Sequence, residues 1–255
     1  MNIDLIDKLT LFPLIFLAGF VDSIAGGGGL ISLPAYLFIG LPSHNALATN
    51  KLSSSIGTTI STLRFAKGKA IIFEVGIFSV IFSFIGSFLG AKLALFLSDD
   101  ILKIILAILI PLAAIFIMIR KPVKNENKEY DLSHIKTIIL SSLIGLIIGM
   151  YDGFFGPGTG TFLIILYVSI LSIDHVKASG TAKIVNLASN ISALLTFIIG
   201  GKVIFSIGLP AALFGIAGNW IGSGLALKNG EKIIKPIMII VLSLLFLKIL
   251  SDIIF

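Results

Sequence analysis

The sequence predicts an all-α fold: a polytopic transmembrane helical bundle of about 8–10 membrane segments, built as two inverted repeats with Gly-rich broken or re-entrant helices. Hydrophobic residues make up 56% of the 255 residues and charged residues 13%, against about 25% charged in a typical soluble domain. The mean hydropathy is +1.10. The polar and glycine positions of the first half also recur, in the same order, in the second half. Together these observations predict a chain that lies almost wholly inside a bilayer.

Ten apolar runs follow one another along the chain. Backbone groups in hydrocarbon must be hydrogen-bonded within the protein, so each run is expected to be a helix, and alternating barrel strands do not fit such continuous runs. The expected helices cover about 9–25, 29–40, 43–66, 71–97, 101–119, 135–152, 158–173, 176–199, 203–227 and 232–254. The runs 29–40 and 158–173 are short for full spans and each follows a glycine cluster, which predicts a broken or re-entrant helix at both places.

One clearly polar interval, RKPVKNENKEYDLSHIK from Arg120 to Lys136, divides the chain near its middle and indicates a solvated loop. Too little polar sequence remains elsewhere for a soluble domain. We therefore expect a single membrane domain over 1–255, with repeat 1 at about 9–119, a cytoplasmic loop at about 120–136 and repeat 2 at about 137–254.

The two halves match at specific residues. GFVDSIAGGGGL, around position 19, corresponds to GMYDGFFGPGTG, around position 149, and HNALATNKLSSS lies over HVKASGTAKIVN. The matched positions are Asp22 and Asp152, Gly26 and Gly156, Gly28 and Gly158, Thr49 and Thr181, Lys51 and Lys183, and the Gly-x-x-x-Gly pairs Gly86/Gly90 and Gly218/Gly222. An ordered series of this kind favours duplication over coincidence.

The distribution of basic residues predicts the orientation. Basic residues favour cytoplasmic loops. They gather at 64–69, in the central loop and at 228–235, whereas the N-terminus and the turn Ser98–Asp100 are acidic. The basic loops share one side if each half crosses the membrane an odd number of times, which inverts the second half and leaves both termini extracytoplasmic. Two full spans or a re-entrant hairpin at each glycine cluster give an odd number, whereas a single broken helix does not.

The glycine clusters are the first candidate site. Glycine allows a helix to unwind, and a half-helix that starts after each cluster would point free N–H groups and the positive end of its dipole inward, which suits an anion. The alternative is tight packing by small residues, which we favour for the Gly-x-x-x-Gly pairs. The candidate substrate-binding residues in the clusters are Gly26, Gly27, Gly28, Gly156, Gly158 and Thr159.

Asp22 and Asp152 are expected inside the bilayer, where a charge costs on the order of 3 kcal/mol or more and is rarely without a function. They would take part in ion coupling, with H⁺ or Na⁺ as the coupling ion, or cap the helix breaks by accepting backbone N–H bonds. An intramembrane aspartyl protease is less well supported, because no Gly-x-Gly-Asp motif follows.

Lys51 and Lys183 form a second matched pair with hydroxyl and amide neighbours. Such donors suit a small oxyanion, which predicts substrate contact. Snorkelling to headgroups or pairing with the aspartates is the alternative. The candidate substrate-binding residues on these helices are Thr49, Asn50, Lys51, Thr181, Lys183 and Asn186. His44 and His175 begin their segments, which favours an interfacial role, and Glu74 and Lys92 are candidates for burial without repeat partners.

Several functions find no support in the sequence. The chain has no cysteine, which excludes disulfides and thiolate sites. It shows no metal-ligand cluster, P-loop or serine triad, so we predict no catalytic residue, metal or cofactor, and no enzyme. The net charge of +6 is thinly spread, so no nucleic-acid partner is expected. The expected partners are a small anionic substrate, membrane lipid and a coupling ion, and no particular oligomeric state is predicted.

These motifs resemble the sulfite exporter TauE/SafE family of membrane permeases. The resemblance rests on GFVDSIAGGGGLISLP, HNALATNKLSSSIGT, the Gly-x-x-x-Gly helix and their second-half counterparts, and it covers essentially the whole chain. It implies transport of small sulfur-containing anions, such as sulfite or an organosulfonate, across a prokaryotic plasma membrane. We therefore expect a secondary transporter, or permease, that works by alternating access. The alternatives are an uncoupled anion channel, or a non-transport membrane enzyme or assembly factor.

Overall fold

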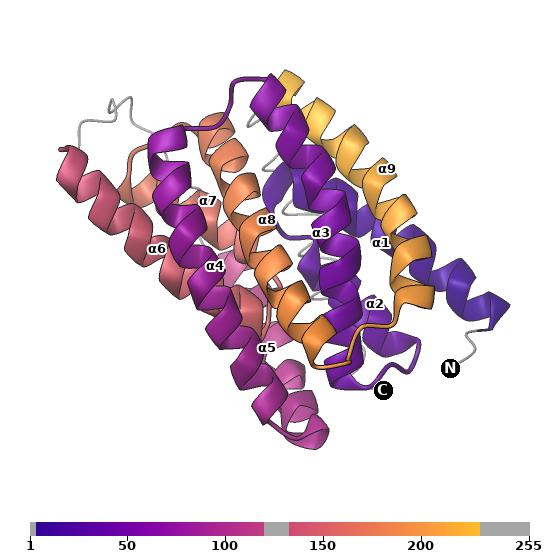
Figure 1. Ribbon diagram of the computed structural model, residues 1–255. Helices are drawn as coiled ribbons and strands as arrows, with labels where there is room; N and C mark the ends of the chain where they lie inside the picture. Colours follow the sequence, from indigo (N-terminus) through magenta and orange to yellow (C-terminus); the bar gives the residue numbers. More distant parts are fainter. Residues whose placement is uncertain (1–3, 120–132, 230–255) are drawn as a thin grey trace.

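The computed structural model describes residues 4–119 and 133–229, and every regular element in these two ranges is an α-helix (Figure 1). The helices are α1 Leu5–Ala25, α2 Gly29–Phe38, α3 Ser43–Lys67, α4 Phe73–Phe96, α5 Asp99–Ile119, α6 His134–Phe154, α7 Thr159–Ile170, α8 His175–Ile199 and α9 Phe205–Asn229. The predicted all-α fold is confirmed. The helix predicted at 232–254 lies outside the described residues.

Local sequence signals fix the helix ends close to their predicted positions. The side chain of Asp174 accepts hydrogen bonds from the N–H groups of Val176 and Lys177, which satisfies two free donors at the start of α8. Pro42 directly precedes α3, and Gly68 and Gly200 follow the ends of α3 and α8. Such residues favour helix termini, so the apolar runs predicted most of the boundaries to within a few residues.

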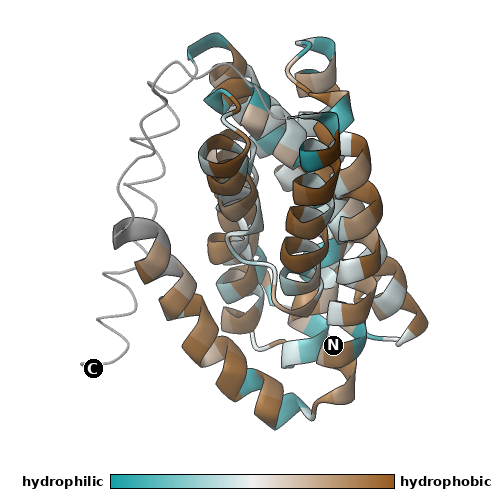
Figure 2. Ribbon diagram, turned by 90° about the vertical axis from the view of Figure 1, so that its left-hand side faces the viewer, coloured by the Kyte–Doolittle hydropathy of each residue, from teal (hydrophilic) through white to brown (hydrophobic). Residues whose placement is uncertain are grey.

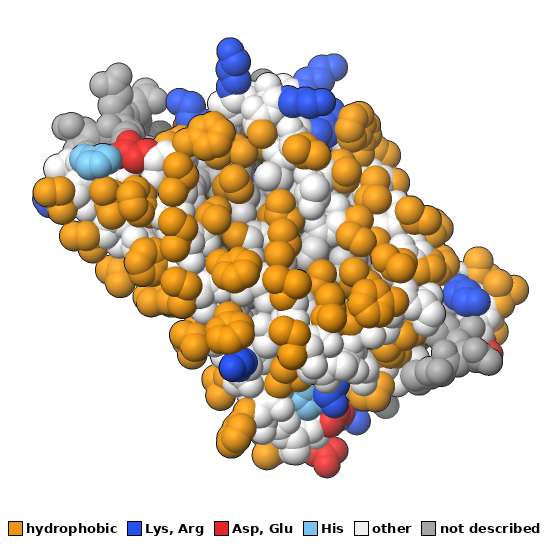
Figure 3. Space-filling model, in the orientation of Figure 1, with side chains coloured by type: hydrophobic (Ala, Val, Ile, Leu, Met, Phe, Trp, Pro, Cys, Tyr) orange, Lys and Arg blue, Asp and Glu red, His pale blue; other side chains and the backbone are white. Residues whose placement is uncertain are grey.

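Five of the described helices are long and apolar enough to cross a membrane: α1, α4, α6, α8 and α9. Hydrophobic side chains cover the outward faces of the bundle, and Lys and Arg gather at its upper end (Figure 3). Figure 2 shows the same pattern, with hydrophobic residues along the helices and hydrophilic residues concentrated toward their ends. The chain is therefore a multi-pass membrane protein, as predicted.

Two helices are too short to cross the hydrocarbon core. α2 has 10 residues and α7 has 12, which at 1.5 Å per residue is about half of the 30 Å core. Each follows a break with left-handed glycines: Gly26 has φ 77° and Gly158 has φ 85°. α2 begins near the middle of the molecule and ends at the lower end, where the chain turns into α3 (Figure 1). This geometry fits a re-entrant hairpin better than two full spans.

Helices at matched positions of the two halves run in opposite directions. In Figure 1, α3 runs upward and α8 downward, while α4 runs downward and α9 upward. The halves also interlock, because α4 packs mainly on α6 of the other half and α1 packs mainly on α9. α3 and α8 lie against each other in the interior. An inverted repeat would produce this arrangement.

The Gly-x-x-x-Gly pairs lie where backbones approach closely. A Cβ at Gly86 would lie 2.2 Å from the carbonyl oxygen of Leu146, and a Cβ at Gly218 would lie 2.1 Å from that of Phe16. A real Cβ is not tolerated at such distances, so these glycines allow α4 to pack on α6 and α9 on α1. The contacts support the packing interpretation of these pairs.

Glu74 and Lys92 are not buried, contrary to the expectation that they could be. Glu74 is partly exposed in the first turn of α4, where its Oε1 lies 2.6 Å from Nδ1 of His134. Lys92 is exposed, and its Nζ lies 4.6 Å from the centre of the Phe88 ring. A long apolar helix presents one face outward, and both residues lie on that face.

Candidate functional site

The two glycine clusters meet in the interior of the bundle. The N–H of Thr161 donates to the carbonyl of Gly26 at 3.3 Å, and the Thr161 hydroxyl donates to the carbonyl of Ala25 at 2.8 Å. A Cβ at Gly26 would lie 2.2 Å from the carbonyl carbon of Gly160, so no larger residue fits at this crossing. The short helices α2 and α7 thus start from one shared point.

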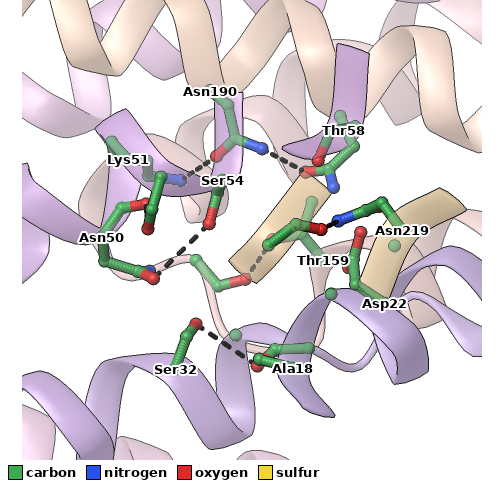
Figure 4. Close-up of a pocket in the computed structure, with 18 of the residues that line it drawn as sticks. Ala18, Asp22, Ser32, Asn50, Lys51, Ser54, Thr58, Thr159, Asn190 and Asn219 are labelled. Atoms are coloured by element: carbon green, nitrogen blue, oxygen red, sulfur yellow. Dashed lines mark hydrogen bonds between the residues drawn. The ribbon is translucent and has the colours of Figure 1, made fainter. Parts of the chain in front are cut away.

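A polar cavity lies beside this crossing (Figure 4). It measures about 40 Å³, counted as the space that the centre of a water molecule can occupy, which is enough for a few waters or one small anion. Its lining comes from both halves: Ile15, Ala18, Gly19, Asp22, Gly26, Gly28, Gly29, Ser32, Asn50, Lys51, Ser53, Ser54, Thr58, Asp152, Gly156, Thr159, Gly160, Asn186, Asn190, Gly215 and Asn219. Side-chain amides, hydroxyls and glycine backbone dominate this lining.

Two buried ion pairs join the halves at the cavity. Lys51 Nζ lies 2.7 Å from Asp152 Oδ2, and Lys183 Nζ lies 2.7 Å from Asp22 Oδ2. Each lysine therefore pairs with the aspartate of the opposite half. An unpaired charge in such a place is strongly unfavourable, and the four charges cancel. The sequence left substrate contact and pairing with the aspartates as alternatives for the lysines, and in this structure both lysines pair with aspartates.

The pair between Lys51 and Asp152 belongs to a network that faces the cavity. Lys51 Nζ donates to Asn190 Oδ1 at 3.0 Å, and the Thr159 hydroxyl donates to Asp152 Oδ1 at 2.8 Å. Both charged side chains are only 2% exposed. Asp152 Oδ2 has no hydrogen-bond partner of good geometry among the described residues, so its contact with Lys51 is an ion pair without a well-aligned hydrogen bond.

The pair between Lys183 and Asp22 is enclosed differently. Lys183 is 0% exposed, its Nζ donates to both the carboxylate and the carbonyl oxygen of Asp22, and it does not line the cavity. Asp22 is 15% exposed and does line it. The two pairs are equivalent by sequence but differ in their access to the cavity.

The cavity brings together most, but not all, of the residues predicted to form the site. Lining it are Asp22, Gly26, Gly28, Asn50, Lys51, Asp152, Gly156, Thr159 and Asn186, whereas Gly27, Thr49, Gly158, Thr181 and Lys183 lie outside the lining. Thr49 Oγ1 accepts from the N–H of Ile204 at 3.1 Å, and Thr181 Oγ1 accepts from the N–H of Ile72 at 3.0 Å. These threonines fix the connections that lead into α9 and α4.

The aspartates do not cap the short helices. Neither α2 nor α7 has a side-chain cap hydrogen bond at its start, and Asp152 meets α7 only through the Thr159 hydroxyl, not through a backbone N–H. The carboxylates instead face lysines, which leaves the ion-coupling interpretation as a proposal. Near the lower end, His44 Nδ1 lies 3.0 Å from Asp99 Oδ1 and His44 Nε2 lies 3.0 Å from the carbonyl of Ala94, a position at the end of the bundle and away from the cavity.

Comparison with known proteins decides the family. The sequence profile described as "Sulfite exporter TauE/SafE" matches residues 11–249, nearly the whole chain. The chain belongs to the TauE/SafE family. The family resemblance seen in the motifs is thereby confirmed.

Bacterial relatives of this family cover nearly the same length. "Probable membrane transporter protein YfcA" of Escherichia coli (strain K12) is 36% identical over 95% of this chain and 89% of its own. "Probable membrane transporter protein ORF9" of Sinorhizobium sp is 36% identical over 95% and 92%. A "Probable membrane transporter protein" of Haemophilus influenzae is 32% identical over 95% and 94%. No solved structure matches the chain. These names indicate a membrane transporter.

Asn219 is a cavity residue of this TauE/SafE member that the repeat pattern did not reveal. Its Nδ2 donates to the carbonyl of Gly215 at 3.0 Å, its Oδ1 has no partner among the described residues, and the side chain is 3% exposed. Its repeat counterpart is Ser87, so matching positions could not identify it. An amide inside an apolar helix, directly after Gly218, was the available signal.

Within the described ranges, no group of three or more His, Cys, Asp or Glu side chains stands close enough together to hold a metal ion. The polar groups at the cavity offer ion pairing and hydrogen bonding. The donors are a lysine, side-chain amides, hydroxyls and the glycine backbone.

Proposed function

We propose that the chain is a secondary transporter, or permease, for a small sulfur-containing anion such as sulfite or an organosulfonate. The observation that carries the proposal is the buried polar cavity where both glycine breaks and the Lys51–Asp152 pair meet. The family is described as a sulfite exporter, which supports this class of substrate. The size of the cavity favours a compact anion over a long organic one.

The substrate would be held by donors from both halves. Lys51 supplies an ammonium, and Asn50 and Asn186 supply amides. Thr159 lines the cavity at the start of α7, where its hydroxyl orients Asp152. Backbone N–H groups at the starts of the two short helices add the positive ends of the helix dipoles. Discontinuous helices that meet at the middle of a bundle are the usual position of a transporter site.

The proposed mechanism is alternating access between two inverted repeats. Three observations support it. Matched helices of the two halves run in opposite directions, each lysine pairs with the aspartate of the other half, and the two glycine breaks cross each other in the interior. We further propose that both termini are extracytoplasmic. Arg64 and Lys67 end α3, and Lys228 ends α9, at the upper end in Figure 1, where a cytoplasmic position suits basic residues. The first helix starts near the lower end.

Counterflow of labelled sulfite in proteoliposomes tests the proposal. A transporter gives saturable exchange that unlabelled sulfite accelerates from the opposite side, whereas a channel gives conductance and an enzyme or assembly factor gives neither. Lys51→Met should abolish exchange, and Lys92→Met, which removes an exposed lysine from α4, is the matched control. The proposal is wrong if sulfite, organosulfonates and other small anions all fail to move.

A further inference from the structure

We infer that the transported anion binds together with one proton at the pair between Lys51 and Asp152. The proton adds to Asp152 Oδ2, and the anion takes the place of that carboxylate beside the Lys51 ammonium. The inference rests on the proposed transport function and adds its coupling ion and stoichiometry: electroneutral cotransport of one monovalent oxyanion and one H⁺.

The balance of charge is the first argument. The charged groups at the cavity are Lys51 on α3, Asp152 on α6, Asp22 on α1 and, behind Asp22, Lys183 on α8, and they sum to zero. The helices α2, α7 and α9 contribute only neutral lining groups. A bare anion would add an uncompensated charge inside the bundle, which is expensive. An anion that arrives with a proton leaves the sum at zero.

Among the described residues, two tyrosines also lie at this site, and both hydroxyls are engaged. Tyr36 on α2 donates to Ser53 Oγ at 2.8 Å, and Tyr151 on α6 donates to the carbonyl of Pro157 at 2.6 Å. Asp152 therefore remains the acceptor for a proton at this pair. Its Oδ1 already accepts from Thr159, whereas Oδ2 is held only by the Lys51 charge. Oδ2 is the atom that the proton would occupy.

The same contacts argue against Na⁺ as the coupling ion. A sodium ion at Asp152 would lie beside the Lys51 ammonium, which is 2.7 Å from the carboxylate, and would be repelled by it. Hard cations also require several oxygen ligands around them. A proton needs only one carboxylate oxygen, and by neutralising Asp152 it frees Lys51 for the anion.

The position of Lys51 makes the exchange of partners feasible. Its Nζ lines the cavity next to Asn190 and Gly156, so the ammonium meets an arriving anion without leaving its place. Lys183 has no such access, because Asp22 holds it through two oxygen atoms. The two pairs therefore have different roles, with coupling at Lys51 and Asp152.

A second observation points to a ligand in this cavity. Asn219 Oδ1 is buried, lines the cavity and has no hydrogen-bond donor among the described residues. A buried acceptor without a partner is costly, so the ligand should supply a donor. A monovalent oxyanion that carries one O–H meets this need directly, and a water beside an aprotic anion meets it indirectly.

Methanesulfonate is the probe that isolates the protein's own proton, because this anion stays a monoanion at all working pH values. In proteoliposomes with a trapped pH dye, uptake of methanesulfonate should acidify the interior by one proton per anion. A clamped membrane potential should not change the rate, and replacing Na⁺ by K⁺ should not either. The apparent affinity should rise by about tenfold per pH unit toward acid.

Asp152→Asn mimics the protonated aspartate and gives a specific signature. The variant should exchange anion for anion at a rate independent of pH, but a proton gradient should no longer drive net uptake. Glu74→Gln removes a partly exposed carboxylate at the start of α4 and is the matched control, which should keep the coupling. Proton uptake by the purified wild type on addition of methanesulfonate provides a second measurement that needs no variant.

The outcomes separate the two proposals. Anion flux or binding without proton uptake, flux that carries current, or a requirement for Na⁺ overturns the coupling and leaves the transport function standing. The absence of flux for every anion tested, together with the absence of proton uptake on binding, overturns both.

Discussion

At the residue scale, the Lys51–Asp152 pair determines which substitutions the interior tolerates. Both side chains are 2% exposed. Removing one partner of a buried pair leaves an uncompensated charge and typically costs about 3–5 kcal/mol, whereas replacing both partners with neutral groups is often close to neutral. Stability and transport should therefore respond differently to single and double substitutions at this pair.

We expect Lys51→Met alone to lower the thermal stability of the protein and the double variant Lys51→Met/Asp152→Asn to recover most of the loss. Neither variant should transport, because both lack the ammonium. Thermal unfolding in detergent, combined as a double-mutant cycle, measures the coupling between the two positions. A double variant less stable than either single variant would show that the pair is not held together by its charges.

A second residue-scale prediction concerns Asp99, the first residue of α5, which lies before the apolar part of that helix. Partial burial would raise the pKa of Asp99, but hydrogen bonds from the His44 and Ser43 backbone and the His44 ring outweigh it, so the pKa lies below the ordinary 3.8. A carboxyl whose pKa is lower in the folded than in the unfolded protein contributes its full stabilisation of the folded state at pH values above the unfolded pKa. That stabilisation is lost as the pH falls through the folded value.

The melting temperature of the wild type should therefore fall below about pH 4. The Asp99→Asn variant should have a lower melting temperature than the wild type near neutral pH. Its melting temperature should fall less than that of the wild type when the pH is lowered below about 4. The neighbouring exposed carboxyl provides the control, since Asp100→Asn removes a charge without these bonds. Parallel pH profiles for wild type and Asp99→Asn would contradict the assignment.

The sequence predicted the four charged residues of the site but not their partners. Repeat matching singled out both aspartates and both lysines, and it left pairing and substrate contact as alternatives. Asp22 pairs with Lys183 and not with Lys51 of its own half. Which lysine faces which aspartate depends on how the two halves interlock, and no spacing along one chain encodes that.

At the element scale, α4 and α6 pack through two stripes of small residues. Gly145, Gly149 and Gly153 recur every four residues on α6, and a Cβ at each would lie 2.0–2.4 Å from a backbone oxygen of α4. The facing residues on α4 are serines at the same spacing, Ser79, Ser83 and Ser87. Small residues on both helices allow their backbones to approach closely.

We expect Gly149→Ala to separate these helices and to destabilise the protein by about 1–3 kcal/mol, the usual cost of overpacking. A Cβ there would lie 2.4 Å from the carbonyl oxygen of Ser83, which is backbone and cannot rotate away. Gly76→Ala is the matched control on α4, because its Cβ would meet only side-chain atoms at 3.7 Å or more. Thermal unfolding compares them, and equal stability of the two variants would contradict the packing argument.

Helix positions were predictable and helix partners were not. Apolar runs bounded by Pro42, Gly68 and Gly200 gave the ends of α3 and α8 to within about a residue of the predicted limits, because these residues act locally. The glycines of α6 and the pair Gly86/Gly90 of α4 are visible in the sequence, but the α4 residues that face the α6 glycines are serines, and similar small-residue patterns occur on other helices. Nothing local therefore identifies α4, from the other half, as the helix against which α6 packs.

At the scale of the whole molecule, the two halves differ in the polar residues at matched positions: one set lines the cavity and the other is enclosed between helices. The cavity is lined by α1, α3 and α9, through residues such as Gly19, Thr58 and Asn219. At the matching place in the other half, α6 is closed against α4, where Ser87 is 0% exposed and donates to the carbonyl of Ser189 at 2.6 Å. If the two halves are inverted repeats, as we propose, this difference implies a second state in which the halves exchange the two arrangements.

This asymmetry leads to a prediction about side-chain access. The chain has no cysteine, so single cysteines can be introduced without removing any. Asn219→Cys and Ser87→Cys occupy matched positions, one at the cavity and one in the closed contact. If the halves exchange conformations, a small membrane-impermeant thiol reagent should reach Asn219→Cys from one face of the membrane and Ser87→Cys from the opposite face.

A saturating anion should shift the population between the two states and so change the two labelling rates in opposite directions. Ser61→Cys is the control, because Ser61 is 0% exposed and does not line the cavity, and it should stay unlabelled from both faces. Labelling of both cysteines from the same face would contradict exchange between inverted repeats. It would instead indicate a pore with one fixed opening.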